Sequence, residues 1–427
     1  MDVLLLNARV KNPNYHAAMT PPLGLAYIGA VLLEDGFSVE AKDLNATELG
    51  DEDLIRLLLE GKPRLVGISA YTETYNNALH LAAIIKKTDS KIPIVIGGPH
   101  VSVLPDETLS AGVFDVVSIG EGEYTILELA RLYVRGDGDL DDIKGIAFMR
   151  NSEIIRTAER ESVSDVDTLP FPARELFHLE AYRLPAALLT SRGGCPFACN
   201  FCAVNNIWKG SRRFRSPEKV IEEIDFLVKN FSFDILNFSD DSFTLSRSRI
   251  MRLCELIRER YGIMVLNWQC ATRVDLIDEE LIRSMRSAGC QIIQFGVESG
   301  SQRVLDTTGK RITLKQVDDA VKLVLKYGIT PLCSFMFPHP ADTEESLQEQ
   351  IELMKSLKHQ GAQLSLALTT PYPGTYYNEM HEPLGLKILS DNWDEYDCQH
   401  IVIETDRFSE AELQLQLERM VREVGLV

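Results

Sequence analysis

Three cysteines within eight residues are the strongest chemical signal in the chain. Cys195, Cys199 and Cys202 form a C-x3-C-x2-C pattern, directly after Gly193-Gly194 and an apolar, strand-like run at 186–190. Thiolates this close either share one centre or are accidental neighbours. An iron–sulfur cubane normally takes four cysteine thiolates. Because this run offers three and no nearby fourth, one iron would stay open to a small molecule.

Two other interpretations of the cysteines are weaker. A structural zinc site usually shows paired C-x2-C knuckles or added histidines. Here there is one C-x2-C pair, and no histidine lies between Cys202 and His339. A buried structural thiol is common for a lone cysteine, but it accounts poorly for three together. We therefore predict a cluster.

The run from Ser191 to Cys202 resembles the cluster loop of the radical S-adenosylmethionine (SAM) superfamily, including the aromatic Phe201 before the last cysteine. The resemblance implies a [4Fe-4S] cluster whose open iron is chelated by the amino and carboxylate groups of SAM. In that family the cluster donates one electron, a C–S bond breaks and a 5′-deoxyadenosyl radical forms. It also implies that Phe201 contacts SAM.

Composition narrows the class of protein. The chain has 427 residues, 45% hydrophobic and 25% charged, with a net charge of −19. That charge argues against a general nucleic-acid binder, which needs a basic footprint. Five further cysteines are scattered, as in a reducing cytoplasm. No basic leader precedes the first apolar run, and the longest apolar stretch, near 24–33, is too short to span a bilayer. We expect a cytoplasmic protein without nucleic-acid or membrane partners.

The first third of the chain alternates short apolar runs with amphipathic segments. This pattern predicts a doubly wound parallel sheet. The expected strands are 3–6, 37–41, 65–69, 94–96 and 116–119, and the expected helices are 23–35, 51–60, 76–87 and 123–134.

Small residues follow several of these strands. Ligands of such sheets bind beyond the carboxyl ends of the strands, where glycine lets a bulky ligand approach, although ordinary turns also favour glycine there. The order Pro22-Leu23-Gly24, Val66-Gly67-Ile68-Ser69, Ile96-Gly97-Gly98-Pro99-His100 and Gly120-Glu121-Gly122-Glu123 resembles the cobalamin-binding domain that precedes many radical SAM barrels. The resemblance covers 1–140 and implies cobalamin contacts at Ser69, Gly97, Gly98, Gly120 and Glu121.

One motif of that domain is missing. Many cobalamin domains carry Asp-x-His-x-x-Gly after the first strand, and its histidine ligates cobalt from below. Here Asn7 to His16 lacks the pattern. His16 and His100 are candidate ligands by position only, and an ordinary loop histidine is the alternative for each. Relatives of this type include chains without the histidine and chains that have lost cobalamin, and both alternatives stay open.

A linker and a second domain follow. Residues 141–184 contain a hairpin pattern around Asn151-Ser152 and an extended Leu169-Pro170-Phe171-Pro172. Six strand–helix repeats then predict a partial (β/α)6 barrel at 185–380, with a small α/β extension at 381–427 that ends in a helix opened by a capping box at Ser409. The expected strands are 186–190, 235–239, 265–270, 292–297, 332–337 and 364–368, and the expected helices are 217–230, 246–261, 279–287, 314–327 and 343–359.

Polar residues follow the barrel strands, where barrel chemistry is found. Ser239, Asp240 and Asp241 come after the second strand, either as an Asx-type helix cap or as a site for an ammonium group. Glu298 follows the fourth strand, in Gly296-Val297-Glu298-Ser299-Gly300. The resemblance implies that Ser239 and Asp240 contact the methionine amino group, with Asp241 as a further candidate, and that Glu298 binds the ribose diol.

Other positions carry two interpretations each. Arg212-Arg213-Phe214-Arg215 is either a solvated loop or a carboxylate or phosphate site near the cluster, and we assign Arg215 to SAM. Arg273 is a similar case. His339 and Ala341 replace glycines of a Gly-x-Pro-Gly-Glu-Thr turn of the family, and Cys398 is either a hydrogen donor or an inert thiol.

The resemblance implies an enzyme, a cobalamin-dependent methyltransferase acting on an unactivated carbon or a phosphorus centre in a small molecule or peptide. Flavodoxin or ferredoxin would supply electrons. The alternatives are radical dehydration, epimerisation, cyclisation or rearrangement with a degenerate cobalamin domain, or a non-catalytic cluster protein. No catalytic residue is assigned beyond the cluster cysteines.

Overall fold

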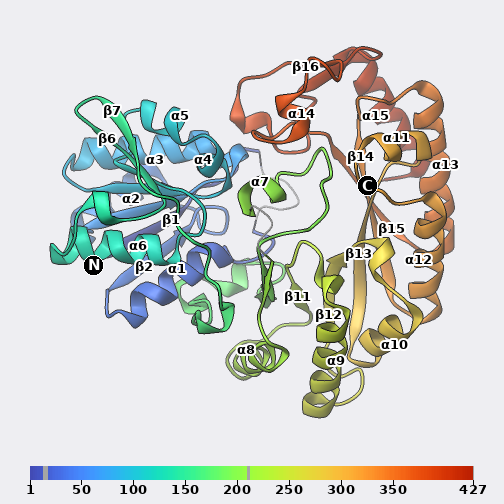
Figure 1. The fold of residues 1–427 in the computed structure, drawn as a ribbon, viewed down its shortest axis with the longest axis horizontal. Helices are drawn as coiled ribbons and strands as arrows, with labels where there is room; N and C mark the ends of the chain where they lie inside the picture. The colour runs from blue at the N-terminus through green and yellow to red at the C-terminus, as the bar shows by residue number, and fades with distance from the viewer. Residues whose placement is uncertain (13–17, 209–211, 427) are drawn as a thin grey trace. The chain divides into compact units, whose positions relative to one another are not determined.

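The computed structural model describes residues 1–12, 18–208 and 212–426. The chain forms two compact units, Met1–Pro185 and Ala186–Val427 (Figure 1). Along the described residues, no helix combines the length and the apolar character needed to cross a membrane.

The first unit is built on a seven-stranded sheet with strand order β2-β1-β3-β4-β5-β6-β7. The first five strands in this order are parallel, and the last two pair antiparallel. The central strands are buried on both faces, as expected for a sheet covered by helices. Their bounds are β1 Val3–Asn7, β2 Val39–Asp43, β3 Leu65–Ser69, β4 Ile94–Gly97, β5 Val116–Ser118, β6 Ile146–Arg150 and β7 Glu153–Arg156.

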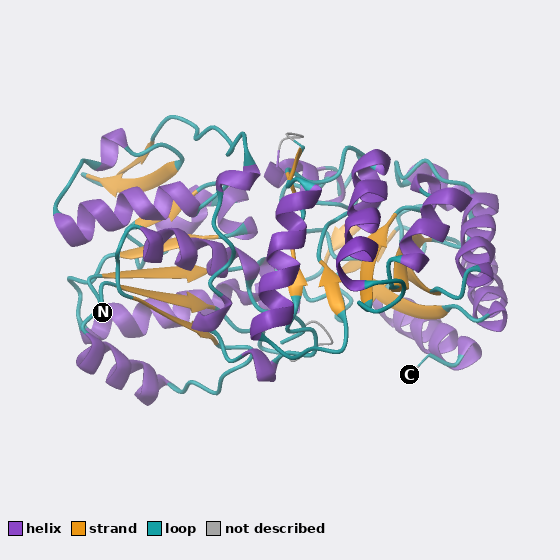
Figure 2. Cartoon of the chain, turned by 90° about the horizontal axis from the view of Figure 1, so that it is seen from below, coloured by secondary structure: helices purple, strands orange, loops and turns teal. Residues whose placement is uncertain are grey.

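Helices cover both faces of this sheet (Figure 2). Helix α2 shows why such segments fold: its first turn carries Asp51, Glu52 and Asp53, which favour a helix N-terminus, and Leu54 and Leu58 bury one stripe. The predicted helix 123–134 is α-helical to Ala130 and continues as a π turn. The helices are α1 Leu23–Glu34, α2 Asp51–Gly61, α3 Tyr75–Thr88, α4 Pro99–Val103, α5 Pro105–Ser110 and α6 Glu123–Ala130.

The hairpin of β6 and β7 differs from the expectation. The sequence analysis places it in the linker 141–184, whereas Val116 of β5 pairs with Phe148 of β6, so the hairpin extends the first sheet. Asn151 and Ser152 form its turn, both with positive φ. Hydrophobic periodicity identified the hairpin, but only the pairing shows which sheet receives it.

The second unit contains a six-stranded sheet in chain order, β15-β14-β13-β12-β11-β8, with every pair parallel. Helices follow the strands, which confirms the predicted open barrel. The strands are β8 Ala187–Leu188, β11 Leu236–Phe238, β12 Trp268–Thr272, β13 Cys290–Glu298, β14 Thr330–Phe337 and β15 Gln363–Leu368; the helices are α8 Pro217–Asn230, α9 Arg247–Tyr261, α10 Glu279–Ser287, α11 Gln302–Thr307, α12 Leu314–Lys326 and α13 Glu344–Gln360.

The third barrel strand lies later than predicted. The apolar run from Val265 suggested 265–270, but Ile263 and Val265 are 71% and 65% exposed and the strand begins at Trp268. Single exposed apolar residues are common on protein surfaces. Consequently β12 ends at Thr272, and Arg273 stands at its carboxyl end.

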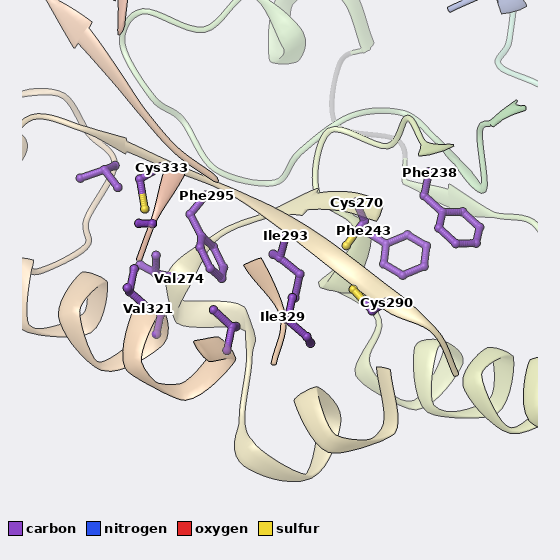
Figure 3. Close-up of a cluster of buried hydrophobic side chains, with 14 of the residues drawn as sticks. Phe238, Phe243, Cys270, Val274, Cys290, Ile293, Phe295, Val321, Ile329 and Cys333 are labelled. Carbon is purple, nitrogen blue, oxygen red and sulfur yellow. The ribbon is translucent and has the colours of Figure 1, made fainter. Parts of the chain in front are cut away.

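The barrel core is aromatic and aliphatic (Figure 3). Phe238 stacks on Phe243 with centroids 4.5 Å apart, and Trp268 packs edge-on against Phe238. The core also contains the thiols of Cys254, Cys270, Cys290 and Cys333. Burial raises the pKa of each thiol whose shift is resolved, to about 12 for Cys254 and Cys333. These cysteines are packing residues.

The C-terminal extension adds a two-stranded ribbon and a helix. Leu386, Tyr396 and Ile403 pack with Tyr377, and Phe201 of the cluster loop lies against this group. The predicted capping box at Ser409 and Glu412 opens the last helix. The elements are α14 Tyr376–Glu379, β16 Leu386–Ile388, β17 Ile403–Thr405 and α15 Glu410–Val424.

Candidate active site

The cluster loop leaves the barrel after a short strand, β9 (Ser191–Arg192), which pairs with β10 (Arg213–Phe214). Gly193 and Gly194 then have φ of 93° and 72°, the left-handed region that glycine tolerates. The thiols of Cys195, Cys199 and Cys202 are all partly exposed. This backbone reversal therefore presents three cysteines at the barrel mouth.

A second loop, Thr307 to Lys310, holds the cluster loop in place. The Asn200 backbone N–H donates to the Thr308 carbonyl (2.9 Å), and the Asn200 side-chain amide donates to the Thr307 carbonyl (2.9 Å). From α14, the Tyr377 N–H donates to the Asn200 carbonyl (3.1 Å). Asn200 thus joins the cluster loop to the Thr307–Lys310 loop and to α14.

Two cations lie near the thiols. Burial raises the pKa of all three thiols, to about 11 for Cys202, while Arg273 and Lys310 lower the pKa of Cys195 and Cys199. The Arg273 guanidinium also covers the Phe197 ring at 3.6 Å and donates to the Lys310 carbonyl at 2.7 Å. Positive charge near thiolates favours their ionised, iron-binding form.

The described residues contain no group of three histidine, cysteine, aspartate or glutamate side chains arranged around a single metal ion. A four-iron cluster instead gives each thiolate to a different iron. Three partly exposed thiols on one loop, two of them near Arg273 and Lys310, fit that donor set.

Asp240 is buried and engaged by the protein. Its carboxylate accepts from the Thr190 N–H (3.1 Å), from the Thr190 hydroxyl (3.0 Å) and from the Ser191 hydroxyl. Burial raises its pKa, and the hydrogen bonds from these two residues oppose that rise. Asp240 therefore fastens the start of the cluster loop to the end of β11.

Asp241 and Ser239, on either side of Asp240, differ from it in exposure and in hydrogen-bond partners. Asp241 is exposed, and its charge raises the pKa of Cys195 and Cys202, which puts its carboxylate close to the cluster loop. The Ser239 hydroxyl accepts from the Asn237 amide at 2.7 Å. Desolvation of the Asp241 carboxyl and the neighbouring charge of Asp240 raise the pKa of Asp241. Sequence reasoning ranked Asp240 above Asp241, but of the two residues Asp241 is the exposed one.

Glu298 ends β13 in a left-handed conformation, φ 71°, at a shift in the pairing with β14. Its buried carboxylate forms an ion pair with Lys310, which is also buried. A Cβ at Gly296 would overlap the charged ends of both side chains, so a larger residue there would displace the ion pair. Sequence reasoning missed Lys310, because its partner lies twelve positions away.

His339 fills the space beside Glu298. It is fully buried, with Nδ1 3.1 Å from the Tyr377 hydroxyl and Nε2 3.4 Å from the Glu298 carbonyl. The Phe201 ring lies edge-on to both His339 and Tyr377, at 6.2 and 6.4 Å. The histidine that replaces a glycine of the family turn is thus a packing and hydrogen-bonding element beneath the cluster loop.

The arginine-rich segment Arg212 to Arg215 is also held by hydrogen bonds. Arg215 is buried, and its N–H donates to the Thr190 carbonyl at 2.9 Å. Arg249, which sequence reasoning did not select, donates to the carbonyls of Arg215 (2.8 Å) and Thr190 (2.9 Å). Its guanidinium lies 5.4 Å from the Phe214 ring centroid. These contacts fix β10 beside the cluster loop.

In the first unit, the predicted cobalamin contacts lie at the carboxyl edge of the sheet. Ser69, Gly97 and Gly98 end adjacent strands, and a Cβ at Gly98 would overlap the Ala70 carbonyl. Gly120 has φ 82° with open space around its Cα. Glu121 accepts from the Val163 N–H at 2.8 Å. Small residues at these strand ends, with open space beside Gly120, fit the close approach of a large ligand.

The structure describes one of the two histidines considered as cobalt ligands. His16 lies outside the described residues. His100 is 2% exposed, with its ring 4.4 Å from that of Tyr75 and Nδ1 3.2 Å from the Thr72 hydroxyl. Burial lowers its pKa to about 4. His100 is a neutral core histidine and is not presented to a ligand.

Comparisons with known proteins agree with this geometry. The family model for the B12 binding domain matches residues 17–130, and that for the Radical SAM superfamily matches residues 190–354. These matches confirm the predicted superfamily, and with it an enzyme whose cofactors are a [4Fe-4S] cluster, SAM and cobalamin.

Curated relatives match most of the chain. An uncharacterised methyltransferase of Pyrococcus horikoshii is 32% identical over 93% of this chain and 86% of its own length. The anaerobic magnesium-protoporphyrin IX monomethyl ester cyclase of Rubrivivax gelatinosus is 28% identical over 94% of this chain and 74% of its own. Cytidylyl-2-hydroxyethylphosphonate methyltransferase of Streptomyces wedmorensis is 27% identical over 77% of this chain and 72% of its own length.

Solved structures share the fold. The radical SAM methyltransferase TsrM from Kitasatospora setae, with cobalamin and a [4Fe-4S] cluster bound, gives a TM-score of 0.77 at 18% identity, covering 100% of this chain and 89% of that one. The cobalamin-dependent SAM radical enzyme OxsB with aqua-cobalamin bound gives a TM-score of 0.77 at 20% identity. The match covers 98% of this chain and 66% of that one. The predicted fold class is confirmed.

Proposed function

Because the chain belongs to the radical SAM superfamily and carries a B12-binding domain, we propose that it is a cobalamin-dependent methyltransferase acting on an unactivated carbon or a phosphorus centre of a small molecule or peptide. The observation that carries this proposal is the 32% identity to a methyltransferase along 93% of the chain, through both cofactor domains. In this proposal, residues 1–140 bind cobalamin, 185–380 hold the cluster and SAM, and 381–427 shape the substrate pocket.

Cys195, Cys199 and Cys202 would hold the cluster. When bound, the cluster and SAM supply radical generation, and cobalamin carries the methyl group. The chain's own contribution is to orient these groups. Asn200, Arg273 and Lys310 support this assignment, since they fix the loop and place positive charge beside the thiols.

We assign SAM recognition to residues around the cluster loop. Asp241 is the residue for the methionine ammonium, because it is an exposed residue and its charge acts on the thiols of Cys195 and Cys202. Ser239 and Asp240 position it, Asp240 through its hydrogen bonds to Thr190 and Ser191. Glu298 is the acceptor for the ribose hydroxyls, with Lys310 holding its carboxylate in a buried ion pair.

Two further assignments complete the SAM site. Phe201 packs against the adenosine part, supported by its place between the cluster cysteines and the His339–Tyr377 pair. Arg215 is a positioning residue, since it is buried and tied to Thr190. For cobalamin, the contacts are Ser69, Gly97, Gly98, Gly120 and Glu121. The electron donor would be a flavodoxin or a ferredoxin.

A second candidate is radical cyclisation. It is favoured by the relative that is 28% identical over 94% of this chain and is a cyclase. Methyl transfer ranks first because the relative with higher identity is a methyltransferase.

The test does not require the substrate to be known. The anaerobic protein with reconstituted cluster, cobalamin and a one-electron reductant is incubated with SAM, and two products are measured. A methyltransferase yields S-adenosylhomocysteine, which is SAM without its methyl group, in addition to 5′-deoxyadenosine. Production of 5′-deoxyadenosine alone, with cobalamin bound, would contradict methyl transfer and favour cyclisation.

A further inference from the structure

The strands of the barrel sheet carry almost no charge. Strands β8, β11, β12, β14 and β15 contain no acidic or basic residue, and β13 contains only Glu298, its last residue. The charged side chains of the candidate active site therefore stand at the carboxyl ends of the strands or in the loops that follow them. The sheet that leads up to those ends is neutral.

The two faces of this sheet differ in what covers them. In β14 every second residue is buried in the core against the helices, whereas Ser334, between two of them, is partly exposed. In β13, the exposed Gln294 stands between Ile293 and Phe295, which are fully buried. Closed barrels fill their interior with layers of bulky branched side chains. This open barrel instead has an accessible and partly polar inner face.

Three side chains on neighbouring strands form a hydrogen-bonded triad on this inner face. The Gln294 side-chain amide donates to the Ser334 hydroxyl at 2.9 Å, and the Ser365 hydroxyl donates to the same oxygen at 2.9 Å. Ser334 and Ser365 are direct partners in the register of β14 and β15. On β12 and β11, the Gln269 amide donates to the Asn237 side-chain oxygen at 3.0 Å. The polar groups of this face are thus amides and hydroxyls.

The triad keeps hydrogen-bonding capacity for a ligand. The bond between the two serines uses one hydroxyl proton, so the other serine O–H has no acceptor among the described residues. The Gln294 side-chain oxygen likewise accepts from none of the donors that the structure describes, and Gln294 is exposed. The triad therefore offers a ligand one donor and one acceptor on side chains that are bonded to each other.

An amide group complements this donor and acceptor. Its C=O matches the serine O–H, and its N–H matches the Gln294 oxygen. An ionised group fits poorly, because no strand residue of this face supplies a counter-charge and its desolvation is costly. Leu332 and Met336 flank Ser334 on the same face, so a sugar would place hydroxyls against them without partners. A peptide combines amides with aliphatic groups and satisfies both kinds of surface.

We infer that the inner face of the barrel binds the substrate, and that the inserted part is an uncharged peptide segment whose amide is held by Gln294, Ser334 and Ser365. The inference rests on the proposed function, in which a small molecule or a peptide is methylated, and it selects the peptide. The charged side chains at the strand ends remain with SAM and the cluster, so the two ligands use different parts of one barrel.

The test measures binding to the full chain with reconstituted cluster and SAM, without reductant, by ligand-observed nuclear magnetic resonance. Four probes are compared: N-acetylalanine N-methylamide (a neutral peptide unit), N-acetylalanine (a carboxylate), alanine N-methylamide (an ammonium) and methyl glucoside (a neutral sugar). The wild type should bind the neutral peptide unit at least about threefold more tightly than each of the others, the effect of one net hydrogen bond.

Variants of the triad locate the binding. Gln294→Leu removes the acceptor and Ser334→Ala removes the shared hydroxyl, and each should weaken binding of the neutral peptide unit about threefold to tenfold. Gln294→Glu is the most informative variant, because a carboxylate of nearly the same shape should shift the preference to the ammonium probe. Gln414→Glu, at an exposed glutamine on α15, is the matched control and should change no affinity. Unchanged circular dichroism and iron content show that the variants fold.

Several results would overturn the inference: no binding of the neutral peptide unit, equal binding of the four probes, tighter binding of methyl glucoside, unchanged affinity in Gln294→Leu and Ser334→Ala, or no gain for the ammonium probe in Gln294→Glu. These measurements need no turnover. Formation of S-adenosylhomocysteine together with such a result would leave methyl transfer standing. Peptide binding with 5′-deoxyadenosine as the only product of SAM would contradict methyl transfer alone.

Discussion

The ligand-facing edges of the two units are built in different ways. At the barrel mouth, charges are paired or hydrogen-bonded by the protein itself, as in Glu298 with Lys310 and Asp240 with Thr190. At the edge of the first sheet, small residues end the strands, Gly120 has open space beside it, and one hydrogen-bonded turn carries Tyr71. A charged ligand such as SAM needs oriented charges, whereas a corrin needs room and apolar contact. The two edges match those two demands.

The largest expected effect is at the cluster. Cys199→Ala should abolish cluster assembly and SAM cleavage, because the loop supplies three thiolates and no substitute. Iron content and 5′-deoxyadenosine are the measurements. Cys398→Ala, a partly exposed thiol outside the loop, should keep both. SAM cleavage by the Cys199 variant would show that the cluster lies elsewhere.

Next in size is the buried ion pair of the barrel. Lys310→Met leaves the Glu298 carboxylate buried and unpaired, and should lower the free energy of unfolding by about 3–5 kcal/mol. Adding Glu298→Gln to this variant should restore part of the lost unfolding free energy, because the buried charge is then removed. In Lys315→Met the lost ion pair, with Asp319, is exposed to solvent, so the loss of stability should be much smaller. Equal losses for the two lysine variants in denaturant unfolding would contradict the structural role.

At the first sheet, Gly98→Ala tests the close approach of two strand ends. With φ of 116° and the Ala70 carbonyl in the way, the substitution should cost about 3 kcal/mol and weaken cobalamin binding. Gly24→Ala, inside α1 with nothing near its Cα, should be neutral or stabilise by about 0.5 kcal/mol. Thermal unfolding of both variants provides the comparison.

The adjacent aspartates allow a matched pair. Asp240→Asn places an amide where Thr190 and Ser191 donate, and should lower the unfolding free energy by about 2 kcal/mol. Asp241→Asn should leave stability within about 0.5 kcal/mol and weaken SAM binding. Calorimetry measures the unfolding of both variants and their binding of SAM. If Asp240→Asn weakened SAM binding and Asp241→Asn lowered stability, Asp240 would be the residue that binds SAM.

The smallest effect concerns pH. The folded-state pKa of His100 is about 4, below its ordinary 6.5, so the unfolded chain binds the proton first as pH falls. The stability that neutral His100 provides is complete above pH 6.5 and is lost toward pH 4, by about 2 kcal/mol between pH 7 and 5. His100→Gln should flatten this slope, which denaturant unfolding at pH 7 and pH 5 measures.

Most of the fold followed from sequence patterns because helix and strand periodicities are local. Pro217 to Asn230 forms the predicted helix to the residue. The misplaced start of β12 at Val265 shows the limit: an apolar run alone does not reveal whether the sheet reaches it.

The sequence by itself determined the cysteine spacing, the order of the two domains and which residues follow each strand. These properties depend on covalent order and short-range periodicity. The tertiary structure alone decided which of two neighbouring aspartates is accessible, that Lys310 pairs with Glu298, and that His100 is buried while Tyr71 is exposed. Those outcomes depend on partners distant in the sequence, and the desolvation and pairing of each side chain exist only once the chain has packed.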